Sequence, residues 1–286
     1  MDAEAQLLMA CIPGLSAAYG GAEAADVRGN VTLNITNGTF DRVFGGNNLS
    51  GTIGGSITVN VEEIGCRPVK IGELYGGGNL AAYSVFGYNN DGTAKESGTR
   101  LYNDPQVNVM SFTSIGDIYG GGYGSGAKMV GNPTVNINEV YGKYYNNTSG
   151  NTSSVVGENA ETPNHYPIPS HAAGKIGAIN NVFGGGNAAK VIGNTTVNIG
   201  KLSDVYIVKN ITTGSSVTGY YTRDSQGEYH EASGTASADV TYYEKKPVIG
   251  ADIRGNVYGG GNKAEVTGDA KVQIGKKVVP ATSPEP

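Results

Sequence analysis

The sequence predicts an all-β protein, a parallel three-sided β-helix (β-solenoid) of about six coils with three long loop insertions. Six times an aromatic residue is followed by a glycine cluster. In five of these copies an apolar-x-Gly triplet comes next, and the centre of an extended V-N-I-like segment lies five residues beyond its glycine. A spacing that is kept over five copies is typical of solenoid repeats.

The aromatic residues mark one corner of each predicted coil. Tight corners need positive φ angles and close backbone approach, which explains the glycines beside them. We expect each ring to stack on its counterparts in the neighbouring coils. Asn79, Asn187 and Asn262 follow three of the glycine clusters and are expected to form an amide ladder. The corner aromatics are Tyr19, Phe44, Tyr75, Tyr119, Phe183 and Tyr258.

Three short strands are expected in each coil. The segment 31–35, V-T-L-N-I, alternates apolar and polar residues, which is the period of a half-buried strand. A second strand fits 190–192, and a third precedes the aromatic residue, as at 69–74 and 249–257. Neighbouring coils would stack at about 4.8 Å. In the third copy the apolar-x-Gly triplet is predicted to be displaced by an insertion.

Residues 1–277 are predicted to form a single β-solenoid domain, followed by a linker-like tail at 278–286. Growing distances between the corner aromatics place the three insertions at 83–104, 141–175 and 201–248. The second and third leave the same corner, just after the V-N-I strand, so they should project from one side. The sequence begins inside a coil and has only a linker-like tail after its last strand, whereas the ends of a solenoid normally need caps. We therefore expect further coils of its own parent chain, with the signal and anchor outside this fragment.

Composition excludes several partners. The chain has 46 glycines, 16% charged residues and a net charge of −5, and no block of Lys or Arg stands out. Nucleic acid is therefore not expected as a partner, nor is an anionic membrane surface. No apolar stretch approaches the roughly 18 residues of a membrane span, so membrane insertion is not expected. Cys11 and Cys66 occupy equivalent positions two coils apart, about 9–10 Å from each other, which predicts two buried free thiols.

No catalytic, cofactor-binding or metal-binding residue is predicted. No Gly-Lys-Ser/Thr follows a glycine cluster, so a phosphate loop is not indicated. Glu73 and Asp117 occupy equivalent positions before the corner aromatics, followed by Asn181 and Asn256 in later coils, and no arginine or histidine is expected in that column. Adjacent carboxylates could serve a polysaccharide lyase or hydrolase, but a solvated column of acids and amides is favoured.

The insertions supply the candidate ligand contacts. Tyrosine with Asn, Ser and Gly combines rigid aromatic area with adaptable hydrogen bonding, a mixture found in binding loops. The flat outward row of Thr-x-Asn pairs is also a pattern that can bind ice. Gln106 and Lys271 interrupt this row, which disfavours ice binding here. The candidate ligand-contact residues are Tyr144, Tyr145, His165, Tyr166, His171, Tyr220, Tyr221, Tyr229, His230, Tyr242 and Tyr243.

The repeat unit V-[FY]-G-G-G-N-x-A-x-V-x-G-N-x-T-V-N-I also carries a resemblance. Residues 181–200 and 256–275 resemble glycine-rich β-helix repeats of large surface or secreted proteins of gut bacteria, particularly the Bacteroides–Prevotella group. The resemblance implies an extracellular or cell-surface, adhesin-like protein without enzymatic activity, whose loops contact glycans or host proteins. A carbohydrate-active β-helix enzyme and a plain spacer stalk remain the alternatives.

Overall fold

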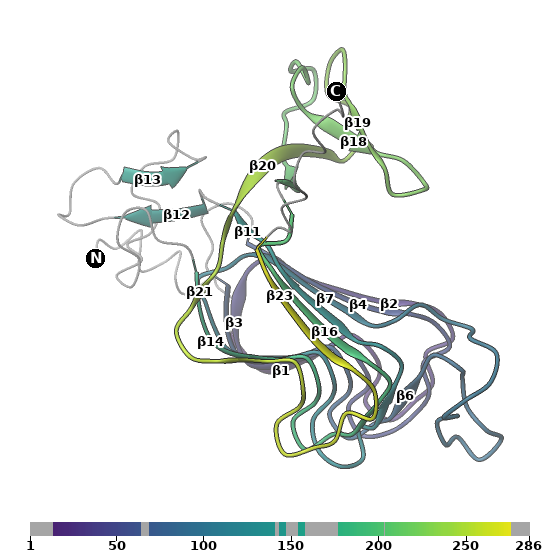
Figure 1. The fold of residues 1–286 in the computed structure, drawn as a ribbon. Coiled ribbons are helices and arrows are strands. Elements are labelled where there is room, and N and C mark those ends of the chain that lie inside the picture. Colours follow the sequence, from purple (N-terminus) through teal and green to yellow (C-terminus); the bar gives the residue numbers. More distant parts are fainter. Residues whose placement is uncertain are drawn as a thin grey trace, which may run out of the picture.

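The described residues form β-strands and no helix, and most of the strands lie in parallel sheets. This part of the predicted fold is confirmed in the computed structural model. Figure 1 shows the parallel strands as a stack of similar layers, with a separate antiparallel unit projecting away from it. The structure describes residues 14–63, 69–140, 143–146, 154–157, 177–202 and 204–275.

The first parallel sheet contains the strands that lead into the corner aromatics. Its strand order is β1-β3-β5-β8-β14-β21, and β22 also pairs with β14. Tyr19 pairs with Phe44, Phe44 with Tyr75, and Tyr75 with Tyr119, so the repeat stays in register. The strands are β1 (Gly14–Tyr19), β3 (Gly38–Phe44), β5 (Val69–Tyr75), β8 (Ser114–Tyr119), β14 (Ala178–Phe183), β21 (Asp252–Ile253) and β22 (Val257–Tyr258).

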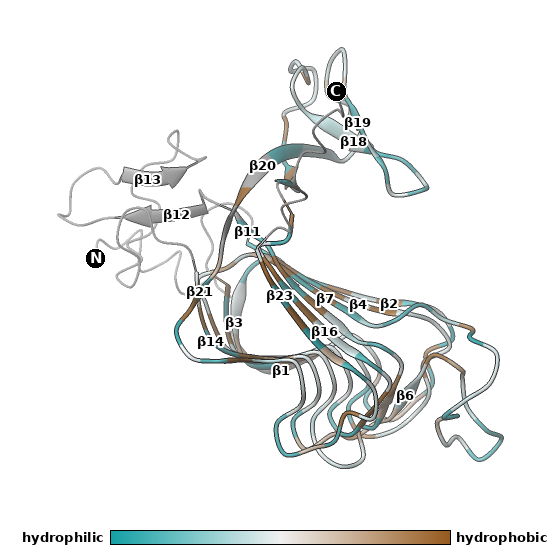
Figure 2. Cartoon of the chain, in the orientation of Figure 1, coloured by the Kyte–Doolittle hydropathy of each residue, from teal (hydrophilic) through white to brown (hydrophobic). Residues whose placement is uncertain are grey.

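The second parallel sheet is built from the V-N-I-like segments. Its order is β2-β4-β7-β10-β16-β23. Apolar residues point inward from both sheets and form one continuous core, in which Val59, Val107, Val135 and Val197 are at most 1% exposed. In Figure 2 the brown colour of hydrophobic residues can be followed along β16 and β23. The strands are β2 (Val31–Ile35), β4 (Ile57–Glu62), β7 (Gln106–Ser111), β10 (Thr134–Ile137), β16 (Thr195–Ile199) and β23 (Ala270–Ile274).

A short third parallel sheet lies between these two along the chain, with β6 (Tyr83–Ser84), β9 (Met129–Val130) and β15 (Val191–Ile192) in the order β15-β9-β6. Tyr83 pairs with Met129, so the third copy keeps this segment in place and its insertion begins after Ser84. The repeat pattern did not reveal strand β6, because Tyr83–Ser84 has no glycine. Its backbone still pairs, while the Tyr83 hydroxyl donates to the Gly55 carbonyl at 2.9 Å.

The corner rings stack as the sequence predicts. Centroids of successive rings lie 4.8 to 5.1 Å apart, with interplanar angles of 5 to 10°. The glycines beside them serve close approach rather than positive φ: a Cβ on Gly45 would lie 2.5 Å from the Gly76 carbonyl oxygen. Positive φ is found instead at Gly131 and Gly193, which end the apolar-x-Gly triplets.

An amide ladder runs along the second sheet. Each asparagine at the centre of a V-N-I strand donates from Nδ2 to Oδ1 of its counterpart in the preceding layer, at 2.9 to 3.0 Å. The ladder expected after the glycine clusters is only partial. Asn262 donates to Asn187 at 3.3 Å, but Asn187 donates to the Tyr75 hydroxyl because Tyr123 occupies the intervening position. The ladder consists of Asn34, Asn60, Asn108, Asn136 and Asn198.

The second and third insertions form antiparallel pairs. Strand β12 (Lys143–Asn146) pairs with β13 (Ser154–Gly157), and β17 (Asp204–Lys209) pairs with β20 (Tyr242–Gly250). Strands β18 (Tyr221–Arg223) and β19 (Tyr229–Glu231) complete a hairpin beside β20. β20 also pairs with β11 (Glu139–Val140), the segment that enters the second insertion, so the two insertions adjoin. Cys11, Cys66 and the tail 278–286 lie outside the described residues.

Candidate functional site

Four tyrosines lie on one face of the antiparallel unit 204–248. Residues that pair directly across antiparallel strands place their side chains on the same side of a sheet. Val208 pairs with Tyr243, Tyr243 with Tyr221, and Arg223 with Tyr229. Tyr206 pairs with Lys245 and alternates with Val208, so it shares this side. We call this surface the tyrosine face: Tyr206, Tyr221, Tyr229 and Tyr243, with Arg223 and Lys245.

The rings of the tyrosine face contact one another. Tyr206 stacks on Tyr229 with centroids 4.0 Å apart and planes 8° apart. Tyr221 meets Tyr206 edge-on at 4.9 Å, and Tyr243 meets Tyr229 edge-on at 5.1 Å. The Arg223 guanidinium lies over the Tyr229 ring, 5.5 Å from its centroid, and burial raises the pKa of the Tyr229 hydroxyl. All four tyrosines are half-buried.

The antiparallel unit is held against the stack by specific contacts. The Val208 N–H donates to Oε1 of Glu62, at the end of β4, at 2.9 Å. Val205 is buried on the other side of β17 and packs with Met110 of β7 and with Val248. The tyrosine face is therefore positioned by the stack and not by the loop alone, which lowers the conformational entropy lost on binding.

The predicted contact residues of the third insertion divide into three groups. Tyr221, Tyr229 and Tyr243 belong to the tyrosine face. Tyr242 is buried in a small apolar cluster with Val217 and its hydroxyl accepts from the Ser237 N–H, so it supports the fold of the unit. Tyr220 packs against the same cluster, and His230 is exposed with its Nε2 2.7 Å from Oδ2 of Asp224.

The remaining predicted contacts belong to the second insertion. His165, Tyr166 and His171 lie outside the described residues. Tyr144 and Tyr145 lie on β12, which pairs with β13. The sequence prediction did not include Tyr206, Arg223 and Lys245. The alternation in D-V-Y-I-V-K, residues 204–209, was the available signal for Tyr206, because it indicated a strand with Tyr206 on one side.

A polar column runs along the outer side of the first sheet, and the prediction that it holds no arginine is wrong. Arg42 pairs with Glu73 in register, and Glu73 with Asp117. The Arg42 Nε lies 2.9 Å from Oε2 of Glu73, and its guanidinium is 4.9 Å from the centroid of Tyr123. Arg42 precedes its corner ring by two residues, as Glu73 and Asp117 do, which is why it enters the same column.

The carboxylates of this column are already engaged by neighbours. Oδ1 of Asp117 accepts from Asn181 at 2.9 Å, and Oδ2 accepts from the Tyr119 hydroxyl at 3.3 Å. Burial raises the pKa of Tyr119 to about 12, with the charge of Asp117 adding to the effect. Arg42 forms an ion pair with Glu73, and the two hydrogen bonds hold Asp117 in place, which suits a structural role better than proton transfer.

Glu139 is a buried acid where the antiparallel unit rejoins the stack. It is fully buried, and its Oε2 accepts from the Asp252 N–H at 3.1 Å, while its Oε1 has no hydrogen-bond partner among the described residues. Burial raises its pKa to about 9, with the charge of Asp252 adding to the rise. The carboxyl is therefore neutral at pH 7, which makes its burial tolerable.

Comparisons with known proteins do not assign the chain to a family: no family model, curated protein or solved structure matches it. Within the described residues, no group of three or more His, Cys, Asp or Glu side chains is arranged to hold a metal ion. No helix in the same part of the chain has the length and apolarity to cross a membrane.

Proposed function

We propose that the chain is a three-sided β-solenoid of six coils whose tyrosine face binds glycans or proteins, without catalysis, outside the cell or at a cell surface. The three parallel sheets support the proposed solenoid. The chain passes through the first sheet and the second sheet six times each, and strands of the third sheet lie between those passes along the chain. The resemblance of residues 181–200 and 256–275 to bacterial surface repeats supports the location.

The tyrosine face is the observation that carries this function. Tyrosine rings offer a large contact area with little rotamer entropy, and their hydroxyls reach polar groups of a ligand. Arg223 and Lys245 lie on the same side of the sheet as the rings and carry further N–H donors. Such a surface is not needed for the stability of the stack, whose core lies between the parallel sheets.

Single tyrosine substitutions test the proposal. The 286-residue chain is applied to an array of glycans and host matrix proteins, beside Tyr221→Ala and Tyr243→Ala. These two rings meet the central Tyr206–Tyr229 stack edge-on, so their removal leaves that stack in place. Each variant should lose roughly tenfold or more in affinity for the ligand of the intact chain, the loss typical of an interface hot spot.

The matched control is Tyr102→Ala, a half-buried tyrosine of the first insertion, which should leave binding unchanged. Far-UV circular dichroism and thermal melting verify that each variant is folded. If the intact chain binds nothing on the array, or if both face variants bind as well as the intact chain, the tyrosine face is not the binding site. The first of these results favours the spacer stalk.

A polysaccharide-active enzyme remains the alternative, with Glu73 and Asp117 as its paired carboxylates on adjacent strands. Polysaccharide hydrolysis or elimination can use two such acids. The chain is incubated with pectin-like and other acidic polysaccharides, and the products are assayed for new reducing ends and unsaturated sugars. Product that disappears in Glu73→Gln and Asp117→Asn would overturn the proposal of a binding protein without catalysis.

A further inference from the structure

A hollow lies beside the tyrosine face, on the antiparallel unit. Its volume is about 590 Å³, within the roughly 300–1,000 Å³ typical of small-ligand sites. Residues 222–227, at the turn between β18 and β19, form one part of its lining, and residues 239–241 with Tyr243 form the other. Figure 1 shows β18 and β19 at the end of the unit that projects away from the parallel stack. Because Tyr243 belongs to both surfaces, the hollow continues the tyrosine face.

Hydrogen bonds fix the turn that forms the first part of the lining. Oδ1 of Asp224 accepts from the Gln226 N–H at 2.9 Å and from the Glu228 N–H at 2.8 Å. Oδ2 of the same carboxylate lies 2.7 Å from Nε2 of His230. The hydrogen bond to His230 lowers the pKa of Asp224, so this acid is charged at neutral pH. The turn is therefore held in one shape by a charged side chain at its start.

The second part of the lining is anchored from the interior of the unit. Tyr242 is buried, and its hydroxyl accepts from the Ser237 N–H at 3.1 Å. The Ser237 carbonyl accepts in turn from the Val240 N–H at 3.4 Å. The segment that carries Asp239 is thus held at both of its ends. A hollow with both parts of its lining fixed in this way loses little conformational entropy when a ligand enters.

The chemistry of the lining favours a ligand rich in hydroxyl groups. Among the described residues that line the hollow, Val240 is the only aliphatic one, so an apolar ligand would leave polar groups without partners. Nε of Arg223 donates to the Gly227 carbonyl at 3.1 Å. Within the described part of the chain, the other Arg223 N–H groups and the Asp239 carboxylate have no hydrogen-bond partner. A guanidinium only donates and a carboxylate only accepts, whereas a hydroxyl group does both.

We infer that this hollow binds one unit of a neutral saccharide, an inference that rests on the proposed function of the tyrosine face. Hydroxyl groups of the sugar donate to Asp239 and accept from Arg223, and the apolar side of its ring lies against Tyr243. The charged groups of the lining are two carboxylates, Asp224 and Asp239, and one guanidinium. An acidic sugar would meet more negative than positive charge, which disfavours uronic and sialic acids.

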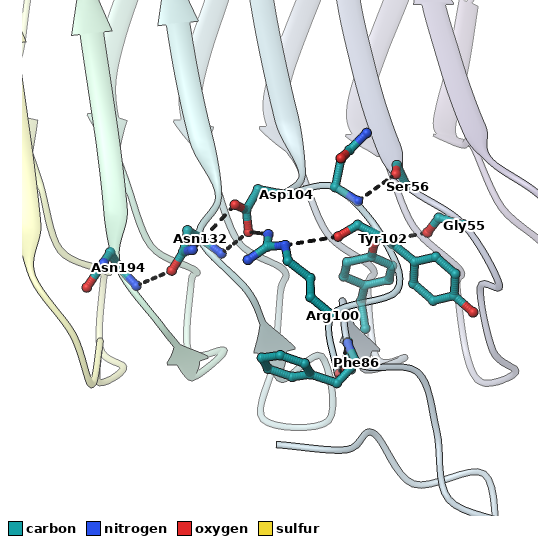
Figure 3. A network of polar contacts seen from close by, with 11 residues as sticks. Gly55, Ser56, Phe86, Arg100, Tyr102, Asp104, Asn132 and Asn194 are labelled. Atoms are coloured by element: carbon teal, nitrogen blue, oxygen red, sulfur yellow. Dashed lines mark hydrogen bonds and ion pairs between the residues drawn. The ribbon is translucent and has the colours of Figure 1, made fainter. Parts of the chain in front are cut away.

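The first insertion carries a second hollow that lacks this chemistry. It lies within residues 86–101 and has a volume of about 530 Å³. The acid in its lining is Glu96, whose Oε1 already lies 2.6 Å from Nζ of Lys128. Figure 3 shows the neighbouring Arg100 turned towards Asp104, with which it forms an ion pair. Because its acid is already paired, this hollow supplies a matched control.

Neutral and acidic oligosaccharides test the inference. Isothermal titration calorimetry of the 286-residue chain measures affinity for galacto-, xylo- and manno-oligosaccharides, and for oligogalacturonides as the acidic counterpart of the galactose series. At least one neutral series should bind more tightly than the acidic one, and added salt should leave its affinity unchanged. Asp239→Ala should weaken this binding roughly tenfold or more, because a hydrogen bond to a charged group is lost. Asp239→Asn retains an acceptor and should weaken it less, while the control Glu96→Ala should bind like the unmodified chain.

Three results would overturn the inference and leave the tyrosine face in place. They are tighter binding of the acidic series, a protein as the ligand found on the array, and unchanged affinity of Asp239→Ala where Tyr221→Ala has lost affinity. A loss in Glu96→Ala without a loss in Asp239→Ala would place the site on the first insertion instead. If the unmodified chain binds no ligand, the proposed function fails together with this inference. Circular dichroism verifies that each variant is folded.

Discussion

Replacing Glu139 by glutamine should make the protein more stable at neutral and alkaline pH and should flatten its pH dependence. The Glu139 carboxyl is fully buried, with one oxygen hydrogen-bonded to the Asp252 N–H and the other without a partner in the part of the chain that the structure describes. Burial raises its pKa from 4.5 to about 9. Between these two values the folded chain holds a proton that the unfolded chain releases.

The sign and size of the change in stability follow from the difference between the unfolded and folded pKa of Glu139. A group with a raised carboxyl pKa contributes its full stability below the unfolded pKa, and that contribution falls as pH rises towards the folded pKa. Each pH unit in this window lowers the free energy of unfolding by about 1.4 kcal/mol. Between pH 5.5 and 7.5, the unmodified chain should therefore lose about 3 kcal/mol more than Glu139→Gln.

Urea denaturation at pH 5.5, 6.5 and 7.5 measures this difference, with Glu23→Gln as the control for removing an exposed carboxylate. The control should follow the pH dependence of the unmodified chain. Equal slopes for Glu139→Gln and the unmodified chain would refute the reasoning, since they would mean that Glu139 does not hold its proton in the folded state.

Two further substitutions test the packing of the layers. Gln273→Asn should stabilise the chain by about 1 kcal/mol in thermal or urea denaturation, because its Nδ2 would reach the buried Oδ1 of Asn198, which has no hydrogen-bond partner within the described ranges. Gln106→Asn, which is outside the amide ladder, should give no gain. Gly45→Ala should destabilise by about 1–3 kcal/mol, since its Cβ would lie 2.5 Å from the Gly76 carbonyl oxygen. Gly260→Ala meets nothing within 4 Å and should have little effect, so equal losses for the two alanines would contradict the close-approach explanation.

The sequence predicts the parallel stack well because the repeat itself encodes the register. The constant five-residue spacing to Asn34, Asn60, Asn136 and Asn198 aligns the V-N-I strands, and these are paired residue for residue in the structure. The corner rings follow for the same reason. The strand Tyr83–Ser84 is not predicted, because its backbone pairing in β6 needs no glycine whereas the repeat pattern is recognised by its glycine.

The candidate site is less predictable because it depends on contacts across long separations. The tyrosine face is assembled from β17, β18, β19 and β20, whose order in space no repeat encodes. The burial of Glu139 likewise requires β11 to pair with β20, more than 100 residues later. Arg42 could have been recognised, since it stands two residues before Phe44 just as Glu73 stands before Tyr75.

Cysteine pairing across two layers tests the in-register stack most directly. In a chain with Cys11 and Cys66 replaced by serine, Thr134→Cys is combined with Thr196→Cys, its paired partner 62 residues away. Paired Cα atoms of adjacent parallel strands lie about 4.8 Å apart, within disulfide range, whereas the diagonal combination of Thr134→Cys with Asn198→Cys places them about 8 Å apart. Mass spectrometry after mild oxidation should detect the disulfide in the paired combination and not in the diagonal one. A disulfide in the diagonal combination alone, or none in the paired one, would contradict the stacking of the repeat.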